Sequence, residues 1–368
     1  MNYSKDSRVV MTLDAGGTNF VFSAIQANHE IIDPICLPSN AHDLDLCLAT
    51  ISDGFRQVGA KLKTYPVAIS FAFPGPTDYV NGIVGDLNNL PAFRGGVPLG
   101  PYLEEKFNIP VFLNNDGDLF VYGEAIAGLL PFVNSKLQEI GMNRRYNNLF
   151  GVTLGTGFGG GIVRNGELFI GDNSAAGEIW VMRNKKYNTF AEESISIRAV
   201  VREYKKHCRF KHDGTLVPKD IYAIAKGTAE GDKTAALNSF RELGEVLGDC
   251  IANAITLVDG IVVVGGGLSA SSDILFPHVL NELNSNFASL DGNPVPRLEM
   301  KAFNLDSEPE LSAFLVGSTR EIKVPGSNRS VTYDPMKRIG VGISRLGTSK
   351  AVSIGAYAYA LHRLDKHS

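Results

Sequence analysis

The fold is decided by one stretch near the N-terminus, residues 9–19, which reads VVMTLDAGGTN. A run of strand-forming residues passes directly into Asp14, two glycines and Thr18, which is typical of a buried strand ending in a tight turn. Gly16 and Gly17 carry no Cβ, so the N–H groups of the turn can face an anion. The Asp14 carboxylate is placed to hold a hydrated Mg²⁺ ion, which prefers oxygen ligands. The stretch lacks the Gly-Lys-Ser/Thr ending of a Walker loop, and taken alone an ordinary hairpin turn explains it equally well.

Two more strand-like runs end in glycine. Residues 149–154 (LFGVTL) pass into 155–161 (GTGFGGG), and residues 261–264 (IVVV) pass into Gly265, Gly266 and Gly267. The first two strand–glycine turns lie about one domain length apart, which indicates duplicated lobes that hold one polyphosphate. At the third, a nucleobase or ribose could lie against bare backbone. The alternative is three ordinary strand ends of an α/β protein.

Size and composition exclude several classes of protein. The chain has 368 residues, 44% hydrophobic and 20% charged, which suffices for two lobes with separate cores. A formal net charge of −4 gives no sign of the positive surface charge that binding to nucleic acid or an anionic membrane requires. The four cysteines are scattered without metal-ligand spacing, as expected of reduced thiols in a cytoplasmic protein. No apolar run is long enough to span a membrane.

The order of expected elements favours an open mixed sheet with helices on its faces. For the first half we expect strands at 9–13, 19–26, 30–37, 66–73 and 111–113, and helices at 44–63, 99–107 and 118–130. For the second half we expect strands within 149–163 and at 261–264, helices near 192–208, 218–230, 232–257 and 274–287, and a hairpin insertion at about 301–348. A last helix, 351–364, should pack back across the first lobe.

In this order, Asp14–Thr18, Asn115-Asp116, Gly155–Gly161 and Gly265–Gly267 resemble the motifs of the ROK family of sugar kinases and related repressors. Three other segments also resemble ROK motifs: the sugar loop at 73–76, the Asn-Leu-x-x-aromatic segment at 89–93, and the Gly-Glu corner at 177–178. The stretch 192–196 resembles the family's Leu-Glu-x-x-x-Ser segment.

The resemblance implies an α/β fold of the two-lobed actin-like ATPase (ribonuclease H-like) class. In that fold two duplicated βββαβα-type domains flank a cleft. We expect an N-terminal lobe of residues 1–117 plus 349–368 and a C-terminal lobe of residues 118–348. ATP and Mg²⁺ are the implied cofactors.

The expected chemistry is in-line transfer of a phosphoryl group from ATP to a hydroxyl of a hexose or N-acetylhexosamine. Positioning and charge neutralisation dominate such a reaction, but it needs an acceptor for the hydroxyl proton. Asp116, at the carboxyl end of a strand, is the expected general base. Alternatively Asp116 caps the following helix, although Asp118 is the better candidate for that cap.

The resemblance assigns the remaining site residues. The expected sugar ligands are Gly75, Asn89, Asn115, Asp116, Glu178 and Glu192. The expected nucleotide and phosphate ligands are Asp14, Gly16, Gly17, Thr18, Gly155, Thr156, Gly157, Gly265, Gly266 and Gly267, with Asp14 acting on Mg²⁺ through water. Glu192 is equally explained as a carboxylate at the start of a helix.

The chain departs from the family pattern at one place. Trp180 stands where the family has a His after the Gly-Glu corner, and residues 181–191 contain no Cys or His. We therefore expect no structural zinc site, and we expect Trp180 to pack beside Glu178 and Glu192. No helix-turn-helix precedes Asp14, so no DNA-reading part is expected.

These observations leave three functions open. The first is a cytoplasmic, homodimeric sugar kinase with a small-molecule sugar as its partner and no nucleic-acid or membrane partner. The second is a non-catalytic sugar-binding or regulatory protein on the same fold. The third is an actin-like ATPase whose nucleotide cycle moves a partner, which the polar sugar-loop residues disfavour.

Overall fold

The computed structural model describes residues 3–75, 77–87, 90–209 and 215–366. The chain forms two compact units. The first unit comprises residues 1–131, 161–177 and 345–368, and the second comprises 132–160 and 178–344. Residues 118–131, 161–177 and 345–348 therefore belong to the first unit, whereas the division expected from the sequence placed them in the C-terminal lobe.

The first unit is built on a six-stranded mixed sheet centred on β1 (Val10–Ala15). Strand β1 pairs antiparallel with β2 and parallel with β5, which pairs parallel with β8. The short strands β3 and β4 both pair antiparallel with β2. Their bounds are β2 Asn19–Gln26, β3 His29–Glu30, β4 Ile35–Pro38, β5 Ala68–Ala72 and β8 Val111–Asn114. The single third strand expected at 30–37 is wrong, because Pro34 lacks an N–H donor and interrupts the pairing.

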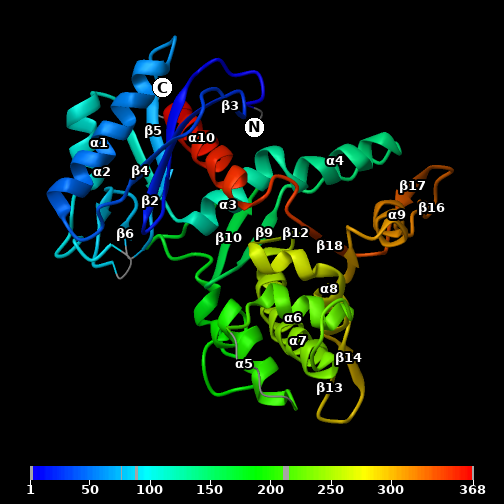
Figure 1. Ribbon diagram of the computed structural model, residues 1–368. Coiled ribbons are helices and arrows are strands. Elements are labelled where there is room, and N and C mark those ends of the chain that lie inside the picture. The colour runs from blue at the N-terminus through cyan, green and yellow to red at the C-terminus, as the bar shows by residue number, and fades with distance from the viewer. Residues whose placement is uncertain (1–2, 76, 88–89, 210–214, 367–368) are drawn as a thin grey trace. The chain divides into compact units, whose positions relative to one another are not determined.

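Helices cover both faces of this sheet. Figure 1 shows α1 (Leu44–Lys61) and α2 (Leu99–Phe107) on one side and α10 (Thr348–Lys366) on the other. Met11, Leu13 and other residues of β1, β2 and β5 share one buried apolar cluster with residues of α1 and α2. The hairpin strands β6 (Thr77–Asp78) and β7 (Ile83–Val84) lie between β5 and α2 in the chain.

The last helix packs against the first unit, as expected. Helix α10 contacts β1, β5 and β8 and runs beside α3 (Asp116–Ala127). The two helices approach very closely, since a Cβ on Gly123 would lie 1.9 Å from the carbonyl oxygen of Ala351. After α3, helix α4 (Leu129–Glu139) carries the chain from the first unit into the second.

The second unit contains a sheet with neighbouring strands in the order β10-β9-β12-β18-β15. Strand β12 is parallel to β9 and β18, and β18 is parallel to β15. The strands are β9 Leu149–Leu154, β10 Phe158–Arg164, β12 Ile261–Gly265, β15 Lys301–Asn304 and β18 Arg338–Ile343. The chain re-enters the first unit within β10, whose end pairs there with β11 (Glu167–Leu168).

Four helices of the second unit fall close to the expected positions: α5 Ile197–His207, α6 Pro218–Lys226, α7 Lys233–Val258 and α8 Ser272–Leu283. Helix α9 (Glu308–Val316) was not expected, because it lies in the segment predicted as a hairpin insertion. Short 3₁₀ turns lie at Ile179–Val181, Ala191–Glu193 and Gly267–Ser271.

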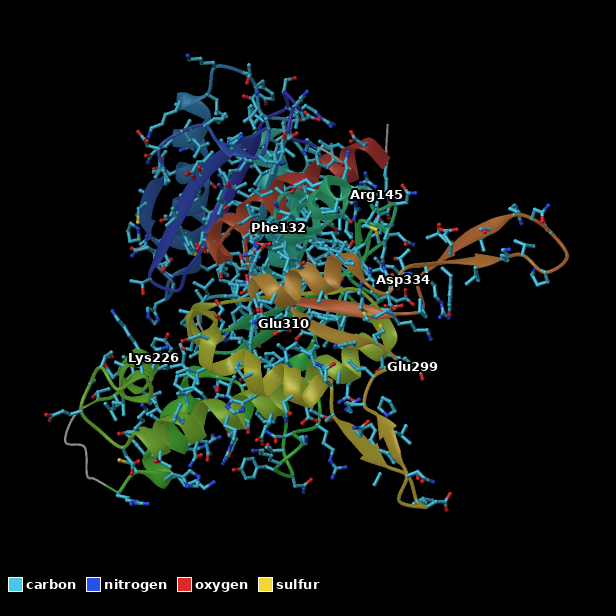
Figure 2. The ribbon with its side chains drawn as sticks, turned by 90° about the vertical axis from the view of Figure 1, so that its right-hand side faces the viewer. Phe132, Arg145, Lys226, Glu299, Glu310 and Asp334 are labelled. Carbon is cyan, nitrogen blue, oxygen red and sulfur yellow. The ribbon has the colours of Figure 1, made fainter. Side chains whose placement is uncertain are left out.

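The region 301–348 is only partly the expected insertion. The hairpin is confirmed as β16 (Arg320–Lys323) and β17 (Ser330–Tyr333), and Figure 2 shows it projecting beside Asp334. Strands β15 and β18 belong to the main sheet instead. Glycines at 340 and 342 lower the strand propensity of β18, and Gly340 is required there because a Cβ would lie 2.6 Å from the Leu305 side chain. A second hairpin, β13 (Asn286–Ala288) with β14 (Pro294–Pro296), was not expected.

Candidate active site

The first glycine turn joins β1 to β2 and is held through its carbonyl groups. Gly16 N–H donates to the Asn19 carbonyl at 3.1 Å, and Ser39 donates to the carbonyls of Thr18 and Gly17 at 2.9 and 2.6 Å. A Cβ on Gly16 would lie 2.8 Å from the Asn19 carbonyl oxygen, so glycine is required there. Residues 16–19 are exposed. The turn is therefore tight and open to solvent, as an anion-binding turn must be.

Two carboxylates lie at the same edge of this sheet. Asp14 is near the end of β1, and Asp116 follows β8; both strands run parallel to β5 between them. Both side chains are exposed. Partial desolvation by the surrounding protein, and then the negative charge of Asp116, raise the pKa of Asp14 above its ordinary value.

The pair of carboxylates fits a Mg²⁺ ion. Mg²⁺ is commonly held by one or two carboxylates together with water and substrate phosphates. A cation beside Asp14 would also relieve the repulsion from Asp116 that raises the Asp14 pKa.

Asp116 is the first residue of α3, and Asn115 caps that helix. The Asn115 Oδ1 atom and the Asp116 Oδ1 atom each accept from the Gly117 N–H at 2.8 Å. The expectation that Asp118 caps the helix is wrong, because the helix begins two residues earlier. The cap engages the Oδ1 atom of Asp116 and not its Oδ2 atom. Since Oδ1 of Asn115 is engaged, a sugar contact would use its amide N–H groups.

The sugar loop after β5 is described only in part. Tyr79 donates its hydroxyl hydrogen to the Phe73 carbonyl at 3.0 Å, and Thr77 donates to the Pro74 carbonyl at 2.9 Å. A Cβ on Gly75 would lie 3.4 Å from the Tyr79 hydroxyl oxygen. Asn89, an expected sugar ligand, and Pro76 lie outside the described residues.

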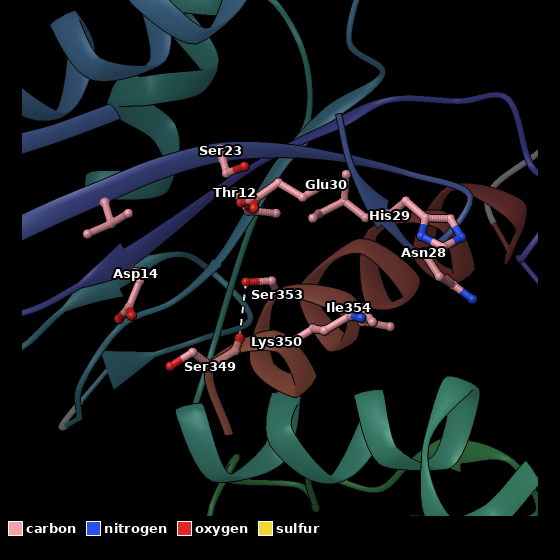
Figure 3. A pocket seen from close by; sticks show the side chains of 12 residues that line it. Thr12, Asp14, Ser23, Asn28, His29, Glu30, Ser349, Lys350, Ser353 and Ile354 are labelled. Carbon is pink, nitrogen blue, oxygen red and sulfur yellow. Dashed lines mark hydrogen bonds between the residues drawn. The ribbon is translucent and has the colours of Figure 1, made fainter. Parts of the chain in front are cut away.

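A pocket of about 410 Å³ opens in the first unit beside Asp14. Its walls are β1 and β2 on one side and the first turns of α10 on the other. Figure 3 shows the Lys350 side chain extending along it, with Ser349 and Ser353 on the same helix. Sequence reasoning missed these residues. The signal available was the run Thr348-Ser349-Lys350, in which hydroxyls and a cation begin a helix.

The second glycine turn joins β9 to β10, and Glu192 supports it. The Phe158 N–H donates to Glu192 Oε2 at 3.0 Å, and Arg198 donates to the other oxygen of that carboxylate at 2.8 Å. The Gly155 carbonyl accepts from the Ile197 N–H at 2.9 Å. A Cβ on Gly157 would lie 2.9 Å from Glu192 Oε2, whereas a Cβ on Gly155 would meet nothing within 4 Å. Glu192 lies in the first turn of the 3₁₀ helix Ala191–Glu193, whereas α5 begins only at Ile197. The helix-start explanation of Glu192 therefore applies to the 3₁₀ helix and not to α5.

The third glycine segment lies beside the second glycine turn. Gly265 at the end of β12 pairs with Thr153 of β9. Gly266 has a φ of +84°, and a Cβ there would lie 2.3 Å from the Leu154 carbonyl oxygen. Glycine is therefore required by both its backbone conformation and its surroundings. The structure thus brings two of the expected nucleotide-binding segments, Gly155–Gly157 and Gly265–Gly267, to one end of this sheet.

The segment that departs from the family pattern is ordered by packing and hydrogen bonds. The Trp180 indole N–H donates to Glu178 Oε2, and the Trp180 ring meets the Phe190 ring edge-on at 5.8 Å. The Ala191 N–H donates to the Met182 carbonyl at 2.8 Å, and this hydrogen bond closes the loop between the two residues. Within the described ranges, no three His, Cys, Asp or Glu side chains gather as a metal-binding group. The absence of zinc stays a prediction.

Comparisons with known proteins show the family of this chain. The ROK family model matches residues 10–314. The chain is 28% identical over 287 residues to the glucokinase of Halalkalibacterium halodurans, which covers 72% of this chain and 81% of that protein. It is 30% identical over 268 residues to the N-acetyl-D-glucosamine kinase of Vibrio vulnificus, which covers 70% and 83%. The crystal structure of a glucokinase from Parabacteroides distasonis superposes with a TM-score of 0.90 at 52% identity, over 98% of this chain and 99% of that one.

The two sheets and their glycine-rich strand ends define a protein of the two-lobed actin-like ATPase fold, as expected. Within that class, the chain belongs to the ROK family. None of the helices in the described part of the chain is both long and apolar enough to cross a membrane.

Proposed function

We propose that this chain transfers the γ-phosphoryl group of ATP to a hydroxyl of a hexose or N-acetylhexosamine, with Asp116 as the general base. That it is a sugar kinase follows from its family and from the kinases to which it is similar. The observation that carries the finer proposal is the pair of exposed carboxylates, Asp14 and Asp116, at one edge of the first sheet.

Each residue has one role in the proposed reaction. Asp116 accepts the proton of the attacking hydroxyl at Oδ2, while its Oδ1 stays bonded to Gly117. The N–H groups of Gly17 and Thr18 in the first turn, and of Thr156 and Gly157 in the second, bind phosphate oxygens. The Gly16 and Gly155 N–H groups instead donate to the Asn19 and Gly157 carbonyls within the turns, at 3.1 and 3.0 Å. Mg²⁺, held through water by Asp14, neutralises charge on the phosphates when it is bound.

The Trp180–Glu178 hydrogen bond supports Glu178 as a sugar ligand. It fixes one carboxylate oxygen and leaves the other able to accept from a hydroxyl. We propose the same role for Asn115, through its amide N–H groups, and for Glu192, Gly75 and Asn89, as the family resemblance implies.

A sugar panel with an ADP-release assay tests the reaction class. Sugar-dependent turnover supports the kinase. Sugar binding without turnover supports the alternative, a non-catalytic sugar-binding or regulatory protein. ATP hydrolysis that no sugar changes supports the actin-like ATPase. Glucose and N-acetylglucosamine are the first sugars to compare, because similar proteins are named for each.

The general base is tested with Asp116→Asn, which keeps the shape and removes the proton acceptor. We expect kcat to fall by about 10²- to 10⁴-fold, with a far smaller change in sugar affinity. Asp45→Asn is the matched control, because Asp45 is also an exposed carboxylate in the first turn of a helix, α1. An Asp116→Asn variant that kept half of its kcat would show that the base lies elsewhere.

Mg²⁺ dependence, a homodimer, a cytoplasmic location and the absence of nucleic-acid or membrane partners are part of the same proposal. Metal titration of the activity and light scattering of the purified protein test the first two directly.

A further inference from the structure

A buried carboxylate that the proposed reaction does not use lies near two of the four points where the chain passes between the two units. Glu124, in α3, is completely buried. Its Oε2 atom accepts from the Leu129 N–H at 2.8 Å and from the Arg345 N–H at 3.2 Å. Its Oε1 atom accepts from the Leu346 N–H at 3.0 Å. One side chain thus holds two backbone segments that are more than 200 residues apart in the sequence.

Those two segments lie next to two of the chain crossings. The chain leaves the first unit after Pro131, two residues after Leu129, and returns to it for the last time at Arg345; the other two crossings lie at 160–161 and 177–178. Any movement of one unit against the other must change backbone angles near these crossings. At two of the four crossings Glu124 holds the backbone on the first-unit side, so bending at these two is confined to the residues beyond Leu129 and before Arg345.

The same helix carries the proposed base. Asp116 begins α3 and Glu124 lies eight residues later, roughly 12 Å along the helix axis. The backbone is packed tightly around the carboxylate, since a Cβ on Gly128 would lie 2.1 Å from Glu124 Oε2. A shift of either crossing segment would therefore be transmitted through Glu124 to the helix that presents Asp116.

We propose that Glu124 is a positioning residue that sets the pivot for movement of the two units during phosphoryl transfer. The inference rests on the proposed function. Only an ionised carboxylate can accept at both oxygens without also donating, and bonds of this kind are stronger than those between neutral groups.

Glu124→Gln is the sharpest test because it changes almost no volume. A glutamine has one acceptor oxygen, so its NH₂ group must face at least one of the three backbone N–H groups. The control is Glu203→Gln in α5 of the second unit. Glu203 is also buried, at 4% exposure, and pairs with Lys206 and Arg202 rather than with backbone near a crossing.

The first measurement is amide hydrogen exchange without sugar or nucleotide. We expect Glu124→Gln to raise the exchange rates of Leu129, Arg345 and Leu346 at least tenfold, and Glu203→Gln to leave them unchanged. Unchanged rates in Glu124→Gln would overturn the inference whatever the activity. If Glu124→Gln does not fold, Gly128→Ala is the substitute, because its Cβ displaces the Glu124 carboxylate and retains the charge. The exchange rates of Leu129, Arg345 and Leu346 should then rise in Gly128→Ala, and unchanged rates would overturn the inference.

The second measurement is steady-state phosphorylation of a sugar that the wild type turns over. We expect kcat to fall at least tenfold in Glu124→Gln, with KM for the sugar within twofold of wild type and kcat of Glu203→Gln within twofold. Faster exchange with wild-type kcat and KM would make Glu124 purely structural and overturn the positioning role. A wild type that phosphorylated no sugar would instead refute the proposed function, and the exchange rates would still show whether Glu124 holds the two segments.

Discussion

Replacing Gly157 by alanine tests how the second glycine turn is built. The new Cβ would lie 2.9 Å from Glu192 Oε2, and the same oxygen accepts the Phe158 N–H at 3.0 Å. Ordinary van der Waals contact with a Cβ begins at 3.4 Å, so the carboxylate must move by about 0.5 Å. Arg198, bonded to the other carboxylate oxygen at 2.8 Å, resists that movement.

The expected cost follows from the hydrogen bond that is stretched. A hydrogen bond to a charged group contributes about 1.5–3 kcal/mol. The Glu192 side chain is 20% exposed, so water partly replaces the lost donor. We therefore expect Gly157→Ala to lower the free energy of unfolding by about 1–2 kcal/mol, a factor of roughly 5–30 in the folding equilibrium.

Gly155→Ala is the matched control in the same turn, because its Cβ would meet nothing within 4 Å. Urea denaturation of the ligand-free protein should show a change within about 0.5 kcal/mol for this variant. In a double-mutant cycle, Glu192→Ala, which removes both the obstructing oxygen and the hydrogen bond, should remove most of the cost of Gly157→Ala. Equal stability of Gly157→Ala and Gly155→Ala would refute the assignment of Glu192 as support for the turn.

Calorimetry with a non-hydrolysable ATP analogue separates stability from ligand binding. If the turn binds phosphate through its backbone, Gly155→Ala should weaken nucleotide affinity although it leaves stability unchanged, because the added methyl group occupies the open space above the turn. Normal affinity in both variants would place the phosphates elsewhere.

Two further predictions concern single charged or aromatic groups. Because folding raises the pKa of Asp14, the ionised Asp14 carboxylate destabilises the folded chain at neutral pH. The Asp14→Asn variant should therefore be more stable than the wild type at neutral pH, by less than about 1 kcal/mol because the site is exposed. The same variant should lose Mg²⁺-dependent turnover. The difference in urea midpoint between Asp14→Asn and the wild type should shrink as the pH falls toward 3.8, the ordinary pKa of an aspartate. A difference that does not change with pH would show that the charge of Asp14 is not what destabilises the wild type. Trp180→Phe removes the hydrogen bond to Glu178, so KM for the sugar should rise more than kcat falls, and the emission of Trp180, the single tryptophan of the chain, should respond to sugar in the wild type. Unmoved emission at saturating substrate, together with full activity of Trp180→Phe, would make Trp180 purely structural.

Local pattern predicted the features that depend on neighbours in the sequence. Strand β1 and the turn at Gly16–Thr18 could be recognised because alternation, glycine and a terminal carboxylate act over a few residues. The start of α3 was misplaced by two residues, because Asn115, Asp116 and Asp118 are all good helix caps and only the backbone path selects Asn115.

By itself, the sequence determined the order of the glycine turns and the candidate base, which follow from residue type and spacing, and the resemblance of those motifs to the ROK family implied the two-lobed class. Only the tertiary structure decided that β18 joins the second sheet, that Glu192 supports the second glycine turn and that Glu124 holds the segment at Arg345. Such contacts join residues from 34 to 221 positions apart. They depend on which surfaces pack together and which buried polar groups then need partners, and no local propensity encodes that.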